Sequence, residues 1–144
     1  MRLQQLCDMD LQYTSPFKAI VPYGGGDGSG WGIGEGTVKG QLVSGTAQWS
    51  NHPHRRGDGA MLPNARGVIT ADSGAEIFFE LSGRTVWVER EGGRRGAQLL
   101  MTLFESQVDD YRWLNNTVCM SEGSIDPETL VLHLRVFSCE NELA

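Results

Sequence analysis

The chain is short of the features that mark secreted, membrane-spanning and thiolate-bound metalloproteins. It has three cysteines, Cys7, Cys119 and Cys139, and none belongs to a CxxC or Cys/His cluster, so neither a disulfide framework nor a thiolate metal site is expected. No window reaches the ~18 consecutive apolar residues of a membrane span, and residues 1–10 contain neither the cationic nor the apolar segment of a secretory signal. The sequence therefore predicts a cytoplasmic protein with reduced thiols and no membrane partner.

Positive charge is scarce as well. The chain has 12 Lys and Arg residues against 18 Asp and Glu residues, a formal net charge of −6 at pH 7. A net-acidic domain lacks the electrostatic footprint that holds a phosphate backbone, so nucleic acid is not expected as a partner. The length of 144 residues is typical of one domain and allows roughly 70% of the unfolded surface to be buried, so we expect a single domain over residues 1–144.

Helix signals are few, whereas short alternating segments recur between Gly, Asn, Asp, Pro and Ser turns. Strands are predicted at residues 6–13, 17–23, 37–41, 44–50, 61–71, 75–81, 84–90, 97–105, 117–121 and 130–138. Residues 107–115 are predicted to form the one short helix, since Asp109 and Asp110 favour a helix start. Because an open sheet of this many strands exposes two edges, the sequence favours an all-β fold, a closed antiparallel β-barrel whose lumen holds side chains or one small ligand.

Two stretches look like cofactor or metal motifs but lack the context that such motifs need. The glycine-rich residues 24–36 open no helix that would point N–H groups at a phosphate, so we expect a flexible lid or entrance loop and no nucleotide. His52 and His54 flank Pro53 in a polar connection without a third strong ligand. We therefore expect neither a cofactor nor a metal. His133 lies in an apolar strand and is interpreted as a structural or outward-facing histidine.

The strand at residues 61–71 carries the most informative polar pair. Asn64 and Arg66 share one of its faces. The other face is made of small or apolar residues: Ala65, Gly67, Ile69 and Ala71. If the small residues pack outward, Asn64 and Arg66 point into the lumen, where Arg66 offers five fixed donors to a carboxylate, carbonyl or enolate oxygen. The alternative is an exposed polar face with Arg66 in a surface ion pair.

Aromatic and acidic side chains would complete such a site. Four aromatic residues are candidate walls of a ligand pocket, with core packing as the alternative: Trp49, Trp113, Phe78 and Phe104. Four acidic residues are candidate bases, provided that they face inward and their pKa is raised: Asp8, Asp10, Glu76 and Glu80. A GxSxG motif, a catalytic Cys/His pair and a paired-carboxylate motif are all missing.

Three segments, in this order and spacing, resemble a family of small bacterial and fungal barrels known as domain of unknown function 3237. The first is the run G-x-x-x-G-x-x-x-x-G-x-A-x-W at residues 36–49. The second is NAR at residues 64–66 before ADSG at 71–74, and the third is FES at 104–106 leading to YRWLN at 111–115. The resemblance covers most of the chain from Gly36 to Phe137.

The resemblance implies a calycin-like or lipocalin-like barrel and a lumen site, but no particular reaction. The residues that it suggests for the site are Trp49, Asn64, Arg66, Trp113 and Asn115. The sequence departs from the family twice: Asn64 stands where an acidic residue is common, and a short turn at residues 91–95 replaces a helix-bearing insertion. The first departure weakens a carboxylate-base mechanism, and the second reshapes one mouth of the barrel.

Two functions fit a small barrel without a metal or nucleotide motif. One is a cofactor-free isomerase, cyclase or lyase, in which the lumen fixes a reactive conformer of a small oxygenated compound while Asn64 and Arg66 stabilise an oxyanion. In this hypothesis the substrate contacts Trp49, Trp113, Asn115, Phe78 and Phe104. The other is a binding or carrier protein for a small hydrophobic metabolite. A homo-oligomer is compatible with either.

Overall fold

A computed structural model describes all 144 residues, which form one sheet and one short helix. Eight long strands make up the body of the sheet: β1 (Arg2–Tyr13), β3 (Gly28–Lys39), β4 (Gly45–Asn51), β7 (Asn64–Ala71), β8 (Glu76–Arg90), β9 (Gly93–Glu105), β10 (Val118–Ile125) and β11 (Val131–Glu140). Three short strands supplement them: β2 (Lys18–Ile20), β5 (His54–Arg55) and β6 (Met61–Leu62). The helix is the 3₁₀ helix η1 (Asp109–Asn116).

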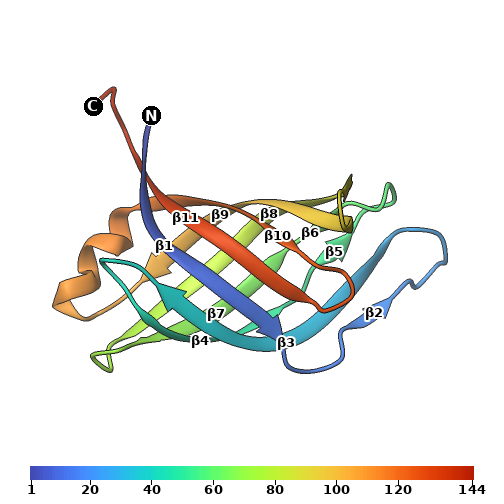
Figure 1. The fold of residues 1–144 in the computed structure, drawn as a ribbon, viewed down its shortest axis with the longest axis horizontal. Coiled ribbons are helices and arrows are strands. Elements are labelled where there is room, and N and C mark those ends of the chain that lie inside the picture. Colours follow the sequence, from blue (N-terminus) through green and yellow to red (C-terminus); the bar gives the residue numbers. More distant parts are fainter.

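The long strands form a closed up-and-down barrel (Figure 1). Each long strand pairs in antiparallel fashion with the next one along the chain, and β1 pairs with both β3 and β11. The pairing of β1 with β11 closes the sheet and leaves the long strands without a free edge. The predictions of an all-β fold and a closed antiparallel barrel are confirmed.

The two ends of the barrel are built differently. At one end, which we call the closed end, η1 follows β9 and places Leu114 in the core. The Asn115 side chain fastens η1 to β9, because its Oδ1 accepts the Ser106 N–H (2.7 Å) and its Nδ2 donates to the Ser106 carbonyl (2.9 Å). The prediction of one short helix at residues 107–115 is therefore confirmed. At the other end, the open end, β2, β5 and β6 surround the mouth (Figure 1).

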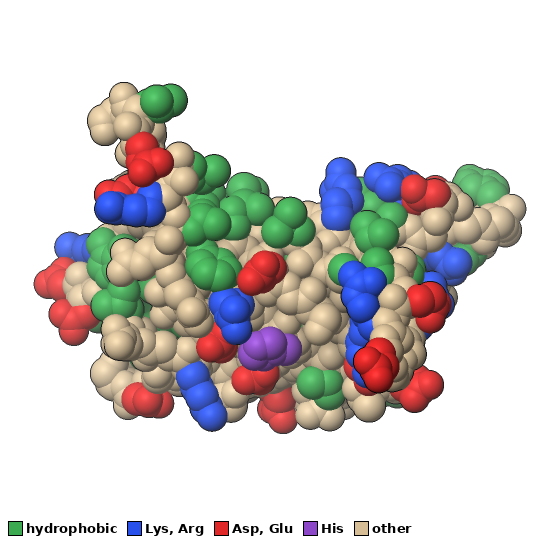
Figure 2. Space-filling view, turned by 45° about the horizontal axis from the view of Figure 1, so that its top comes forward, with side chains coloured by type: hydrophobic (Ala, Val, Ile, Leu, Met, Phe, Trp, Pro, Cys, Tyr) green, Lys and Arg blue, Asp and Glu red, His purple; other side chains and the backbone are tan.

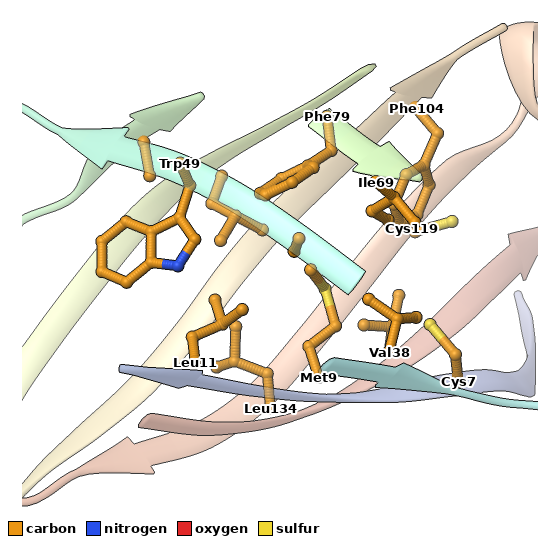
Figure 3. Close-up of a cluster of buried hydrophobic side chains, with 14 of the residues drawn as sticks. Cys7, Met9, Leu11, Val38, Trp49, Ile69, Phe79, Phe104, Cys119 and Leu134 are labelled. Carbon is orange, nitrogen blue, oxygen red and sulfur yellow. The ribbon is translucent and has the colours of Figure 1, made fainter. Parts of the chain in front are cut away.

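Alternation along β1 shows how the core forms. Cys7, Met9 and Leu11 are buried, whereas Asp10 between them is exposed, as the period of two in a strand requires. Figure 3 shows Met9 and Leu11 pointing from one wall of the barrel toward side chains of the opposite wall. The core is thus the packed interior of the barrel.

The glycine-rich segment differs from its prediction. The sequence predicts a flexible lid or entrance loop at residues 24–36, but β3 begins at Gly28 and runs to Lys39, so that prediction is wrong for most of the segment. Inward positions of β3 are glycines: Gly28, Gly30, Gly32, Gly34 and Gly36. Most of the segment is therefore a strand whose inner face carries no side chains.

Candidate functional site

A cavity of about 410 Å³ lies inside the open end of the barrel. This volume is within the range of about 300–1,000 Å³ that is usual for small-molecule sites. Hydrophobic side chains make up most of the lining, with contributions from Leu11, Trp49, Met61, Leu81, Trp87, Leu100, Ile125, Leu130 and Leu132. The cavity is therefore apolar, and the few polar groups in its lining become the candidates for chemistry.

Three aromatic rings form one wall of the cavity. The ring of Tyr13 meets Trp49 edge-on with centroids 4.6 Å apart, and meets Phe17 edge-on at 5.6 Å. The indole of Trp49 is oriented by a hydrogen bond from Nε1 to the Glu35 carbonyl (3.3 Å). Such edge-to-face packing holds the rings in fixed orientations, so the wall is rigid.

The glycines of β3 make room for this aromatic wall. A Cβ atom at Gly32 would lie 2.5 Å from Cε1 of Tyr13, closer than real Cβ contacts. A Cβ atom at Gly30 would overlap the ring of Phe17, and one at Gly34 would overlap the indole of Trp49. The inner face of β3 has to be bare because the rings lie against its backbone.

The Tyr13 hydroxyl is the first polar group of the cavity. Its oxygen accepts a hydrogen bond from Asn51 Nδ2 (2.9 Å), and Asn51 Oδ1 in turn accepts the Asn64 N–H (3.0 Å). Burial raises the pKa of Tyr13, with the hydrogen bond from Asn51 acting in the opposite direction. The phenol therefore stays protonated, and its O–H hydrogen has no acceptor in the protein and is free to donate to a ligand.

Gln98 is the second polar group. Its Nε2 donates to Thr85 Oγ1 (3.1 Å), and both side chains line the cavity. Gln98 is only 8% exposed, yet its Oε1 is buried without a hydrogen-bond partner. Since buried polar atoms are nearly always hydrogen-bonded, this oxygen is an acceptor that a bound molecule would satisfy.

Two arginines stand at the rim of the same cavity. Arg55 lies on β5, and Arg94 lies on β9 with its guanidinium 4.5 Å from the ring centroid of Trp87. They are the charged residues in the lining, which contains no Asp, Glu, His or Lys. The cavity thus combines an apolar body, neutral polar groups inside and positive charge at the mouth.

Asn64 and Arg66 are not in this cavity, so the prediction that they point into the lumen is wrong. The Arg66 side chain is 73% exposed on the outer face, and its Nη2 lies 3.4 Å from Glu80 Oε1. Asn64 is exposed as well. The reason is that Ala65, Ile69 and Ala71 on the opposite face are buried in the core, which turns the polar face outward.

The other predicted ligand contacts are scattered. Trp49 lies in the cavity lining, whereas Phe104 is buried in the core outside it. Phe78 is 61% exposed on the outer face, and Trp113 is half-exposed on η1. Asn115 binds the backbone of Ser106, as described above. The structure therefore does not bring these five residues together, because they belong to different faces and different ends of the barrel.

The predicted acidic bases also lie outside the cavity. Asp10, Glu76 and Glu80 are exposed, and Asp8 is half-buried on β1. The imidazole of His133 is exposed too, with Nδ1 2.7 Å from Asp10 Oδ1, which confirms its interpretation as an outward-facing histidine. No carboxylate is therefore available to a molecule bound in the cavity.

Tyr13, Asn51 and Gln98 are absent from the predicted site, although strand parity contains the signal for all three. Tyr13 continues the buried positions Met9 and Leu11. Asn51 follows Trp49 by two residues, and Gln98 precedes Leu100 by two. A polar residue that continues a buried face is a candidate lumen group, since successive side chains of a strand alternate between faces.

Comparison with solved structures shows that this fold is shared. A β-barrel-like protein from Acinetobacter baumannii matches with a TM-score of 0.85 at 15% identity, covering 96% of this chain and 96% of that one. A protein of unknown function from Clostridium acetobutylicum matches with a TM-score of 0.84 at 17% identity, covering 97% of both chains. An enzyme from Penicillium herquei matches with a TM-score of 0.72 at 17% identity, covering 94% of this chain and 93% of that one. No curated protein matches the chain.

Fold and cavity together define a closed up-and-down β-barrel with an internal, ligand-sized cavity at one end. Within that class, the chain belongs to the family described as Protein of unknown function (DUF3237), whose model matches residues 1–138. The suspected family is confirmed. The helix of this structure, η1, has eight residues, and no helix has the length and hydropathy to span a membrane.

Proposed function

We propose that the barrel binds one small, largely apolar, oxygen-bearing organic molecule in the cavity at its open end. The observation that carries this proposal is the free hydrogen-bonding capacity inside an apolar cavity: the Tyr13 O–H has no acceptor and Gln98 Oε1 has no donor. A ligand hydroxyl could accept from the Tyr13 O–H and donate to Gln98 Oε1, whereas a ligand carbonyl could accept from Tyr13 alone. The carbon skeleton would pack on the aromatic wall.

We further propose that the bound molecule undergoes a cofactor-free isomerisation, cyclisation or elimination. A rigid apolar cavity fixes one conformer of the substrate, and a neutral hydroxyl donor in that environment stabilises a developing oxyanion. Tyr13 suits this role because burial keeps the phenol protonated and Asn51 orients it. The likeness in fold to an enzyme from Penicillium herquei supports an enzymatic role.

Carriage without chemistry is the second candidate, and the lining of the cavity gives the reason. No carboxylate or imidazole reaches the cavity, so no side chain there serves as an ordinary base for proton abstraction. A reaction in this site would have to move a proton within the substrate or through bound water. A carrier needs no such step.

Product analysis separates the two candidates. The purified chain would be incubated with a panel of aromatic ketones and enols, and the products followed by chromatography and NMR, since an isomerisation leaves the mass unchanged. If Tyr13 donates to the oxyanion, Tyr13→Phe should lower turnover about 10²–10³-fold. Tyr111→Phe, at the closed end outside the cavity, is the matched control and should leave turnover unchanged.

Each outcome decides between the proposals. Bound but unchanged ligands across the panel would favour carriage over catalysis. If Tyr13→Phe behaved like Tyr111→Phe in both affinity and turnover, the assignment of the site would be wrong.

A further inference from the structure

The charges in the cavity lining contrast with those of the whole chain. The chain is acidic, with a formal net charge of −6, yet Arg55 and Arg94 are the charged residues of the lining. A pair of cations without an anion at the mouth of an apolar cavity attracts negatively charged molecules and repels positively charged ones. Figure 2 shows Lys and Arg side chains gathered toward the end of the molecule where β2 and β5 lie, although acidic side chains are present there too.

Strand register places Arg55 level with the neutral polar groups of the cavity and Arg94 nearer the open end. Arg55 pairs with Met61, Met61 with Thr85, and Thr85 with Gln98, so a continuous row crosses β5, β6, β8 and β9. Arg94 precedes Gln98 by four residues on β9 and therefore shares its inner face, nearer the open end. Its stacking on Trp87 holds the guanidinium at the mouth.

Neighbouring arginines show that these two are left unpaired. Arg56 lies 2.8 Å from Asp58, and Arg95 lies 3.8 Å from Asp126. Arg55 and Arg94, one residue before each of these, have no carboxylate within 4.0 Å. Arg56 and Arg95, outside the cavity lining, therefore have acidic partners, whereas Arg55 and Arg94, in the lining, have none. The N–H donors of Arg55 and Arg94 are available to a ligand.

We propose that the cavity selects organic acids: a carboxylate at the mouth contacts Arg55 and Arg94, while the apolar body lies against Trp49 and Trp87. This inference rests on the proposed function and adds the charge class of the ligand. A planar carboxylate matches the guanidinium fork, and charge-assisted hydrogen bonds are about twice as strong as neutral ones. The free Tyr13 hydroxyl and Gln98 oxygen would then contact a second polar group at the inner end of the ligand.

Calorimetric titration of the full chain with two ligands of one shape tests the proposal. The probes are 2-naphthoate, which is anionic at pH 7, and 2-naphthamide, which is neutral. We expect the wild type to bind naphthoate about ten-fold or more tightly than naphthamide, because only naphthoate makes charge-assisted contacts. Arg55→Gln combined with Arg94→Gln should abolish this preference and change naphthamide affinity by less than about two-fold, as for other exposed substitutions.

The adjacent arginines supply a control with the same change of net charge. Arg56→Gln combined with Arg95→Gln should retain the preference for naphthoate, since neither side chain lines the cavity. Lysines in place of Arg55 and Arg94 should restore part of the preference, because they restore the charge without the fork. The preference should also fall as ionic strength rises, because the rim is solvent-exposed.

The outcomes separate this inference from the proposed function. Equal affinities of the two probes for the wild type would overturn the preference for organic acids and leave binding in the cavity intact. An equal loss of preference in the control variant would show a long-range effect of net charge and would also overturn it. If neither probe bound, both proposals would be contradicted.

Discussion

The closed and open ends of the barrel use one sheet and one alternation of side chains, but they fill the interior differently. Along β3 the inward positions are glycines from Gly28 to Gly36 and then a fully buried valine, Val38. Gly28 and Gly30 line the cavity, Gly32 and Gly34 lie against the rings of its aromatic wall, and Val38 belongs to the packed core. Whether a stretch of this barrel is core or cavity therefore depends on the size of the inward side chains and not on a change in topology.

Polar groups inside the barrel show the same contrast. In the packed core, the hydroxyls of Thr102 and Ser121 are both fully buried and hydrogen-bond to each other. In the cavity, Tyr13 and Gln98 are each hydrogen-bonded on one side only. Buried polar groups that hydrogen-bond fully to each other contribute to stability. Buried groups that keep a free donor or acceptor can bind a ligand.

The largest expected loss of stability comes from removing an aromatic ring at the closed end. Phe79 is 2% exposed in the core, and Phe79→Ala should lower the free energy of unfolding by about 3–5 kcal/mol, because it leaves a cavity. The neighbouring Phe78 points to the outside, so Phe78→Ala should change stability by about 0.5 kcal/mol or less. Urea unfolding of both variants checks this, and equal losses would contradict the assignment of inner and outer faces.

The two polar pairs should respond differently to substitution. Thr102→Val leaves the Ser121 hydroxyl buried without a partner and should cost about 1–3 kcal/mol of unfolding free energy. Gln98→Met combined with Thr85→Val removes both partners of the cavity hydrogen bond together with an oxygen that already lacks a partner, so the effect should be below about 1 kcal/mol. Thermal unfolding without ligand measures both. A larger loss for the Gln98→Met and Thr85→Val combination would show that the cavity groups serve stability.

The smallest expected effect is the slow chemical modification of the two buried thiols near neutral pH. Burial raises the pKa of Cys7 to about 12 and of Cys119 to about 11, and both thiols are buried in the core. In the native protein, a thiol reagent at pH 8 should therefore modify Cys139 alone, and all three after denaturation. Rapid modification of a second thiol in the native state would mean that this core opens easily.

The raised pKa values of Cys7 and Cys119 also predict how the free energy of unfolding changes at alkaline pH. Unfolded thiols ionise near their ordinary pKa of 9.0, whereas folded Cys7 and Cys119 keep their protons to about pH 12 and 11. Above about pH 9 the folded state therefore holds more protons on these thiols than the unfolded state does. The free energy of unfolding should fall as the pH rises through this range.

The sequence contains enough information to predict the barrel, and the reason is visible in β1. Its alternation of Cys7, Met9 and Leu11 with polar residues predicts a half-buried strand, and the structure confirms it. Asp109 and Asp110 likewise mark the start of η1 correctly. These are local patterns, and a local pattern needs no knowledge of what lies across the barrel.

The site could not be predicted as well, because the direction of a face depends on its distant neighbours. In β7, parity correctly separates Ala65 from Arg66 but does not say which of them faces inward. The small side of β7 is inward because Phe79 fills the adjacent space: a Cβ atom at Gly67 would lie 2.6 Å from the Phe79 ring. That contact crosses between strands and is absent from any single segment.

The bare inner face of β3 has a consequence for how this cavity can diverge among descendants. Because Gly32 lies against Tyr13 and Gly34 against Trp49, a new methyl group on the strand would displace a ring instead of filling empty space. Each glycine and its ring are thus expected to covary in an alignment of relatives. The pocket would change by paired replacements, and a lineage that lost one glycine alone would lose the geometry of its aromatic wall before gaining a new ligand.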